Sequence, residues 1–323
     1  SFLREMRETF SFLAELFGAF LVQCLMLCQC SVTYIILRIR NRSKPIPPNV
    51  FPLRDFSGPG HISIIIPAYK EVDTIGACLQ RLNDCISEPN LVEVIVVDAG
   101  GGDGTMEKVR EAAEGSLSGL TLRTANLPHD SKGGRGATLI AGVAASKGDI
   151  ILFLHADTVV LPGFDGLLRS ELAKDSVLAT AFSFGVNRDS VVAPIAGLAW
   201  MEWTVNIRSS ILELPFGDQA IAMTRQRLDA VGGVPDVPIM EDFELVQKLR
   251  RIGAAGSGRI KTLDAKVLCS GRRWQEKGVW RTNLLNQVIM TAYVYFGFTP
   301  AQIYSWYYSV PFLRSGDGKT KAS

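Results

Sequence analysis

The stretch "GDIILFLHADTVV" places a carboxylate, Asp157, at the exit of an apolar run, with His155 just before it. A strand that is apolar on both faces is typical of a parallel sheet covered on both sides. A charge at the end of such a strand costs free energy unless something there needs it. Because ligands of open α/β sheets bind just beyond the carboxyl ends of the strands, the pattern predicts that Asp157 faces a ligand.

A glycine-rich turn, "VIVVDAGGGDGT", offers a second place for chemistry, because it follows a strand that ends on Asp98. Glycines let the backbone approach a ligand closely, and the start of the next helix favours anions. The motif is similar to the first motif of S-adenosylmethionine-dependent methyltransferases. It follows a second strand rather than opening the domain, however, and the next strand, "LTLRTAN", lacks the acid that would bind a ribose. A methyltransferase therefore stays an alternative.

Strand-like and helix-like runs alternate through the middle of the chain. This alternation predicts an α/β fold with a doubly wound, mostly parallel sheet and helices on both faces. A further helix is expected in "MEDFELVQKLRRIG", which opens on acids and closes on basic residues, as the helix dipole favours. Strands are expected at 62–67, 92–98, 120–123, 149–155 and 177–184, and helices at 74–86, 104–113, 135–146 and 164–173.

Both ends of the chain are apolar. Residues 16–37 carry no charged side chain. This segment is long enough to cross the hydrocarbon core of a bilayer, which takes roughly 20 residues in a helix. The basic stretch "RIRNRSK" follows, which predicts a membrane anchor whose main domain faces the cytosol or an equivalent compartment. Gln23 and Gln29 leave open the alternative of a buried or interfacial helix. The aromatic tail is expected to form core helices or a hairpin at a bilayer surface.

Proline and glycine mark residues 45–60 as a linker. The expected divisions are an N-terminal anchor helix with its basic flank (1–44), this linker, a main domain (61–275) and an apolar helical tail (276–323). A net charge of +2 and a pI near 8.2 do not indicate nucleic-acid binding. The six cysteines show neither a disulfide framework nor the spacing of a zinc finger.

A set of separated motifs occurs in order between about Ile62 and Trp274. They read "SIIIPAYKE", "VVDAGGGDGT", "SKGGRGATLIAG", "LFLHADT", "PIMEDFELVQKLRRIG" and "SGRRWQEKG". In this order they resemble the family-2 glycosyltransferases of the GT-A fold, and "HAD", "MED" and "RRWQ" look like a bacterial-type subgroup. The agreement of several motifs in order and position is more specific than any one of them.

The resemblance implies a nucleoside-diphosphate-sugar donor, either a UDP-sugar or a GDP-sugar. Asp98 could instead cap its turn, Tyr69 could serve ordinary packing, and Arg135 could be a solvated charge at a helix start. Ala99 stands where the family often has a second acid. The residues expected to bind the donor nucleotide are Pro67, Ala68, Tyr69, Glu71, Asp98, Arg135 and Ala156.

The resemblance also implies a divalent cation, Mg²⁺ or Mn²⁺, on the diphosphate. In the family this strand ends in a pair of acids that holds the ion, and here His155 replaces the first acid while Asp157 keeps the second. Imidazole and carboxylate groups both suit such an ion, which would neutralise the leaving nucleoside diphosphate. A core histidine is an equal alternative for His155.

Asp242 is the expected general base, with Glu241 beside it, because the family's "ED" pair opens a helix near the acceptor. An inverting transfer needs a base to take the proton of the acceptor hydroxyl, and a helix start keeps a carboxylate ionised. The two acids could instead be ordinary N-terminal helix charges, and the two arginines of "RRW" a surface pair. The residues expected at the diphosphate or the acceptor are Asp218, Gln219, Arg272, Arg273 and Trp274.

The sequence therefore predicts a membrane-attached, inverting glycosyltransferase. It would move a sugar from a nucleotide-sugar donor to an acceptor that the apolar chain ends indicate is a lipid or a polyprenyl phosphate. Two alternatives remain: the methyltransferase, and a non-catalytic membrane scaffold with a glycosyltransferase-like domain.

Overall fold

The computed structural model of the chain describes most of the main domain and part of each apolar end. The linker expected at 45–60 lies outside the described residues except for Gly60, and so does the last part of the apolar tail. Side chains of α1 are described for only part of that helix. The described residues are 2–42, 60–115, 117, 119–128, 133–256 and 258–309.

Eight strands form one mixed sheet, in the order β3-β2-β1-β4-β7-β6-β8-β5. The pairs β3–β2, β2–β1, β1–β4 and β6–β8 are parallel, whereas β7 pairs antiparallel with β4 and β6, and β5 with β8. The strands are β1 (Ile62–Ala68), β2 (Val92–Asp98), β3 (Thr121–Asn126), β4 (Ile150–Phe153), β5 (Thr158–Val159), β6 (Val177–Asn187), β7 (Ala222–Thr224) and β8 (Arg259–Ser270).

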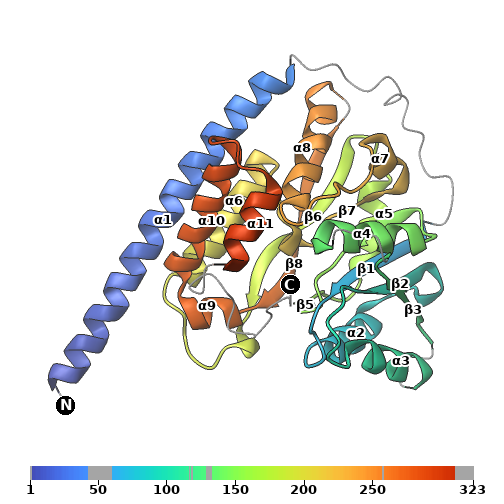
Figure 1. Cartoon of the computed structure of the whole chain (residues 1–323), viewed down its shortest axis with the longest axis horizontal. Helices are drawn as coiled ribbons and strands as arrows, with labels where there is room; N and C mark the ends of the chain where they lie inside the picture. The colour runs from blue at the N-terminus through green and yellow to red at the C-terminus, as the bar shows by residue number, and fades with distance from the viewer. Residues whose placement is uncertain are drawn as a thin grey trace.

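Helices cover both faces of this sheet, which confirms the expected α/β fold class (Figure 1). Short 3₁₀ turns lie at Pro89–Leu91, Arg188–Ser190 and Gly217–Gln219. The helices are α1 (Phe2–Arg42), α2 (Ile75–Cys85), α3 (Thr105–Glu114), α4 (Gly134–Ala145), α5 (Phe164–Leu172), α6 (Leu198–Leu212), α7 (Arg225–Ala230), α8 (Glu241–Ala254), α9 (Arg272–Lys277), α10 (Val279–Val294) and α11 (Pro300–Ser309).

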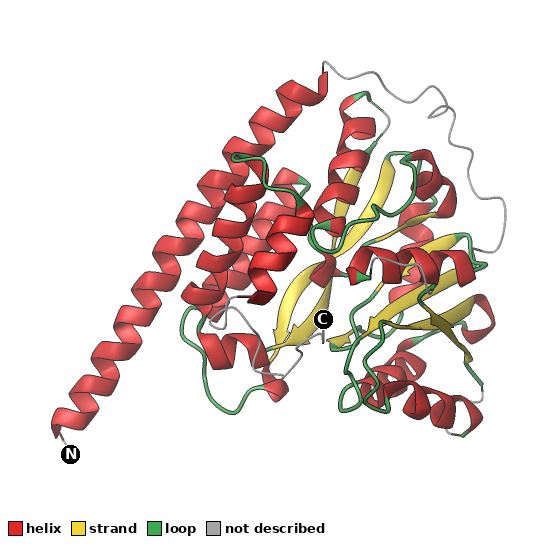
Figure 2. Ribbon diagram, viewed as in Figure 1, coloured by secondary structure: helices red, strands yellow, loops and turns green. Residues whose placement is uncertain are grey.

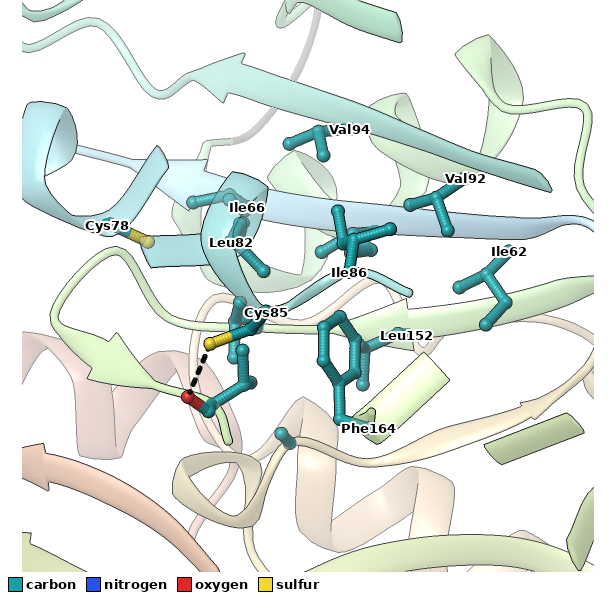
Figure 3. Packing of buried hydrophobic residues seen from close by; sticks show 14 of the residues in the cluster. Ile62, Ile66, Cys78, Leu82, Cys85, Ile86, Val92, Val94, Leu152 and Phe164 are labelled. Atoms are coloured by element: carbon teal, nitrogen blue, oxygen red, sulfur yellow. Dashed lines mark hydrogen bonds between the residues drawn. The ribbon is translucent and has the colours of Figure 1, made fainter. Parts of the chain in front are cut away.

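The alternation of side chains along β1 divides the core into two layers. Ile64 and Ile66 join a cluster with α2, α3 and α5 on one face, while Ile65 joins a cluster with α4, α8, α10 and α11 on the other. Successive strand residues point to opposite faces, so a strand buried on both sides is apolar throughout. Figure 3 shows the first cluster, in which Leu82 and Phe164 pack against the strands and the Cys85 thiol lies 3.4 Å from the Val160 carbonyl oxygen.

The strand expected at 149–155 is shorter in the structure. β4 ends at Phe153, and His155 and Asp157 lie in the turn that follows, closed by a hydrogen bond from the Thr158 N–H to the His155 carbonyl. β5, β7 and β8 were not expected from the sequence, and β6 continues to Asn187, beyond the expected end at residue 184. β7 and β8 lie beyond the alternating βα units, whereas β5 is a two-residue strand between β4 and α5. The antiparallel pairs that β5 and β7 form make the sheet mixed.

α1 lies along α6 and α10 on one side of the molecule (Figures 1 and 2). Two glutamines attach it: Thr204 Oγ1 donates to Gln23 Oε1 at 2.7 Å, and Gln29 Nε2 donates to Thr291 Oγ1 at 2.7 Å. Among the described residues, one helical segment, Ser11–Val32, has the length and the apolar composition needed to cross a membrane. The outer face of this segment exposes large apolar side chains, Phe17 and Leu25 among them.

Candidate active site

A cavity of about 530 Å³ lies at the carboxyl ends of β1 and β4. Its walls come from the turns after these strands, the first turns of α4 and α8, and one side of α10 and α11. This is the position at which open α/β sheets bind their ligands. Most of the residues expected from the sequence line it: Pro67, Ala68, Tyr69, Glu71, Arg135, His155, Ala156, Asp157, Asp218, Glu241, Asp242 and Arg273.

Asp98 and Gln219 do not line the cavity. Asp98 Oδ1 accepts hydrogen bonds from the N–H groups of Gly100 at 2.8 Å and Gly101 at 3.3 Å, so this carboxylate caps its own turn. Gln219 is fully buried, and its Nε2 donates to the Phe182 carbonyl oxygen at 3.0 Å. Their contacts are those of side chains that hold backbone in place.

Arg272 and Trp274 also lie away from the cavity. Arg272 is exposed, and its Nε donates to Ser270 Oγ at 3.2 Å. Trp274 packs edge-on against Phe184 with ring centres 5.8 Å apart, inside a small apolar cluster. Of the "RRW" motif, only Arg273 reaches the cavity wall.

Arg135 and the two acids at the start of α8 form an ion cluster in the cavity. Arg135 Nε pairs with Glu241 Oε1, and Arg135 Nη2 lies 3.5 Å from Asp242 Oδ2. The Gly217 N–H donates to the same Asp242 oxygen at 2.7 Å, while the Phe243 N–H donates to Oδ1 at 2.8 Å. Asp242 is therefore held on both carboxylate oxygens and still lines the cavity.

The ion cluster forms because the start of α4 and the segment before α8 pack with their backbones in contact. A Cβ at Gly134 would lie 2.5 Å from the Cα of Pro238, and φ of +88° at Gly134 is a conformation that favours glycine. The Arg135 N–H donates to the Pro238 carbonyl oxygen at 3.4 Å. The glycines of "GGRG" thus bring Arg135 to the acids of α8.

Burial shifts the pKa of several groups in the cluster. Glu241 has 2% of its surface exposed, and burial raises its pKa to about 7 although Arg135 acts in the opposite direction. Burial, together with the Arg135 charge, lowers the pKa of His155 to about 3, so this imidazole is neutral. Burial also raises the pKa of Asp218. Such shifts concentrate at functional sites.

Three non-glycine residues with a positive φ lie next to the expected site residues. Lys70 has φ of +56°, Ala220 of +49° and Met240 of +70°. Lys70 follows β1, Ala220 follows the Gly217–Gln219 turn, and Met240 directly precedes α8. Left-handed backbone costs free energy for a residue with a Cβ, and it persists where surrounding structure requires it, often at ligand sites.

His155 and Asp157 offer a limited donor set for a divalent cation. His155 Nε2 is buried without a hydrogen-bond partner among the described residues, and the neutral ring has a free lone pair. The described part of the chain contains no group of three or more His, Cys, Asp or Glu side chains arranged for a metal. Mg²⁺ is commonly held by one or two protein ligands together with substrate phosphates. The two residues fit an ion shared with a diphosphate.

The tyrosines of α11 form a wall of the cavity, although no motif in the sequence marked them as site residues. Tyr304, Tyr307 and Tyr308 line it, and Tyr307 Oη accepts a hydrogen bond from Arg273 Nη2 at 3.1 Å. Burial raises the pKa of Tyr308 to about 12. The only sequence signal was the aromatic run "QIYSWYYSV", which is also typical of a core helix or a bilayer surface.

The chain is similar to a solved glycosyltransferase structure and, over part of its length, to curated transferases. The mannosyltransferase of Pyrobaculum calidifontis, in complex with GDP-Man and Mn²⁺, matches 90% of this chain and 81% of its own, with a TM-score of 0.57 and 17% identity. That likeness shows the shared fold. An undecaprenyl-phosphate 4-deoxy-4-formamido-L-arabinose transferase of Aeromonas hydrophila is 36% identical over 100 residues, which cover 30% of this chain and 28% of the relative.

A glucosyl-3-phosphoglycerate synthase of Mycolicibacterium paratuberculosis is 35% identical over 100 residues, which cover 30% of this chain and 29% of the relative. The matched part is thus less than a third of the length of either relative. The family model for glycosyl transferase family 2 matches residues 63–233, more than half of the chain. The family resemblance seen in the motifs is confirmed, and the chain belongs to glycosyl transferase family 2.

Proposed function

We propose that the protein is an inverting glycosyltransferase that moves a sugar from a nucleoside-diphosphate-sugar donor to a membrane acceptor. The observation that carries the proposal is the position of Asp242. A backbone N–H and Arg135 hold this carboxylate at the wall of a cavity formed by strand ends. A carboxylate fixed in this way can take the proton of the acceptor group as its oxygen attacks the sugar.

The donor is a UDP- or GDP-sugar that occupies the part of the cavity beside β1 and β4. Tyr69 offers a ring for the base, and Glu71 offers a carboxylate for base or ribose hydrogen bonds; both line the cavity. Pro67, Ala68 and Ala156 present backbone and small side chains there, so the nucleoside can approach closely. Asp98, which caps its turn, is a supporting residue in this arrangement.

The leaving nucleoside diphosphate needs positive charge. A divalent cation would supply it, held by Asp157 and His155 on one side and by the diphosphate on the other. Arg273 lies on the cavity wall and supplies a second cation. Arg135 contributes less to the diphosphate, because Glu241 and Asp242 already compensate its charge.

The acceptor is an amphiphile, a lipid or a polyprenyl phosphate, that approaches from the membrane side. α1 exposes Phe17, Leu25 and other apolar side chains while its inner face packs on α6 and α10. Gln23 and Gln29 bond to those helices, which supports attachment along the membrane surface rather than an isolated span. The basic stretch after residue 37 suits the anionic lipid of the cytoplasmic leaflet, which supports a main domain on the cytosolic side or its equivalent.

The alternatives lack an observation in their favour. A methyltransferase would use the glycine-rich turn after β2 as its binding loop, yet Asp98 is bonded to the amides of that turn. A scaffold without catalysis leaves the cluster of Arg135 and two buried or half-buried acids in an open cavity without a role.

The test uses the full chain, purified in detergent and returned to lipid nanodiscs. Thermal unfolding is recorded with UDP, GDP, UDP-glucose, GDP-mannose and S-adenosylmethionine, each with and without Mn²⁺. We expect one nucleoside diphosphate and the matching nucleotide-sugar to raise the thermal midpoint, and Mn²⁺ to increase that shift. The same nucleotide-sugar should then serve as donor for sugar transfer to extracted membrane lipid. Stabilisation by S-adenosylmethionine alone would overturn the proposal.

A further inference from the structure

Arg208 of α6 is a buried cation outside the cavity, with no part in the chemistry proposed above. It is 1% exposed and is among the largest fully buried side chains of the described residues. Its Nε is buried without a hydrogen-bond partner in the described part of the chain. Burying a charge is expensive, and well-packed apolar side chains often stabilise a core equally well. The burial of Arg208 therefore points to a role other than stability.

The guanidinium of Arg208 holds both sides of one turn. Its Nη1 donates to the Leu214 carbonyl oxygen, and its Cζ lies 3.6 Å from the centre of the Phe216 ring. A planar guanidinium can stack its face on a ring while its edge donates to a carbonyl, whereas an ammonium group has no planar face to stack. The turn begins at Glu213, which ends α6 with φ of +49°.

The same turn holds the proposed base. Gly217, next to Phe216, donates its N–H to Asp242 Oδ2 at 2.7 Å, and Asp218 follows on the cavity wall. The Arg208 charge also acts on Asp218, where it opposes the rise in pKa caused by burial. A continuous set of contacts thus runs from the Arg208 side chain through the turn to the Asp242 carboxylate.

The N-terminal helix covers this buried cation. Cys30 of α1 is buried close enough to Arg208 for the positive charge to oppose the rise in its pKa that burial causes. One helical turn before Arg208, Thr204 Oγ1 donates to Gln23 of α1. α1 packs against α6 and α10 on the same side of the molecule (Figure 1). α1 therefore helps to keep water from Arg208, which strengthens its contacts with the turn.

We propose that Arg208 is a positioning residue, which fixes the turn at residues 213–220 and through Gly217 sets the place of the Asp242 carboxylate. The catalytic part of this inference rests on the proposed function. A displacement of about 1 Å of a catalytic group can cost about 100-fold in rate. Loss of Arg208 should therefore lower kcat rather than donor affinity.

The experiment compares Arg208→Met and Arg208→Lys with wild type in nanodiscs. Arg227→Met is the matched control, because Arg227 is 5% exposed and also donates to a backbone carbonyl, that of Leu172 at 2.9 Å, away from the cavity. We expect Arg208→Met to lower kcat about 100-fold with the donor KM changed by less than about twofold. The kcat of Arg208→Lys should lie between those of wild type and Arg208→Met. Arg227→Met should keep the wild-type kcat.

A second readout does not depend on sugar transfer. Hydrogen exchange of the peptide covering 213–220 reports the Gly217 amide, which is protected by its bond to Asp242. Arg208→Met should speed this exchange while the thermal midpoint stays near that of Arg227→Met. Unchanged exchange, or a kcat loss matched by Arg227→Met, would overturn the proposal. If wild type transfers no sugar, the proposed function fails, and the exchange result still decides the role of Arg208.

Discussion

Gly217 and Arg135 lie so close that no side chain fits between them. A Cβ at Gly217 would stand 1.8 Å from Nη2 of Arg135 and 3.1 Å from Oδ2 of Asp242. The guanidinium thus packs against the backbone of the turn, where the Gly217 N–H donates to Asp242. The ion cluster and the turn depend on each other for their geometry.

Gly217→Ala is expected to displace Arg135 and to break the Gly217–Asp242 hydrogen bond. We expect sugar transfer to fall by about 100-fold, because the base loses its position. The free energy of unfolding should fall by about 1–3 kcal/mol from overpacking. Gly166→Ala is the control: its Cβ meets nothing within 4 Å and it lies in α5, so the protein should keep its activity. Equal activity of both variants would contradict the contact.

Asp242→Asn keeps the shape of the proposed base and removes its ability to accept a proton. Transfer should fall by about 10²–10⁴-fold, while stabilisation by the nucleoside diphosphate remains. The exposed Asp236→Asn variant, on the segment before α8, should transfer at the wild-type rate. Retained transfer in Asp242→Asn would remove Asp242 from the role of base.

Glu241 predicts a pH dependence of stability. Its pKa is raised from 4.5 to about 7, so the folded protein binds this proton more tightly than the unfolded chain. The proton's contribution to stability is complete below about pH 4.5 and is lost as the pH rises to about 7. Wild type should therefore lose stability relative to Glu241→Gln between about pH 5 and about pH 8, by at most about 3 kcal/mol.

Thermal unfolding of both proteins across this pH range checks the prediction. The exposed Glu276→Gln variant is the control and should follow the wild-type curve. A constant difference between wild type and Glu241→Gln at all pH values would mean that Glu241 is ionised throughout.

Asp157→Ala is expected to weaken the effect of Mn²⁺ on donor binding. The ion would lose one of its two proposed protein ligands, so the Mn²⁺ concentration needed for half-maximal stabilisation should rise at least about 10-fold. Thermal unfolding at a fixed nucleoside-diphosphate concentration and varied Mn²⁺ measures this. Asp175→Ala, exposed and distant from the cavity lining, should not change it. An unchanged Mn²⁺ response would place the ion elsewhere.

The outer face of α1 is expected to bind lipid. Phe17 and Leu25 are each 63% exposed, so replacing both by Ser should leave the packed inner face intact. Burial of such side chains contributes about 1.5–3 kcal/mol each, and the double variant should bind phosphatidylcholine–phosphatidylglycerol vesicles at least about 10-fold more weakly in flotation. Leu161→Ser, before α5, is the control for an exposed apolar residue elsewhere. Equal binding of both variants would contradict a membrane role for this face.

The sequence by itself determined the alternating βα units. The apolar run of β1 and the helices α2 to α5 follow from periodicity and from glycine-rich turns, which act locally. β5, β7 and β8 were missed because they are short or carry charged residues, as in "RIKTLDAKVLCS", and owe their pairing to neighbours distant in the chain. β4 ends before His155 because a turn forms there, which local apolarity did not reveal.

The same division applies to the candidate site. A motif at a strand end marked Asp157, because parallel strands bring their carboxyl ends to one edge of the sheet. The "ED" pair at the start of a predicted helix marked Asp242. Only the tertiary structure showed that Asp98 bonds to its own turn and that the tyrosines of α11 reach the cavity. The burial of Arg208 under α1 joins segments far apart in the sequence. Such contacts depend on packing in three dimensions, which periodicity and spacing do not contain.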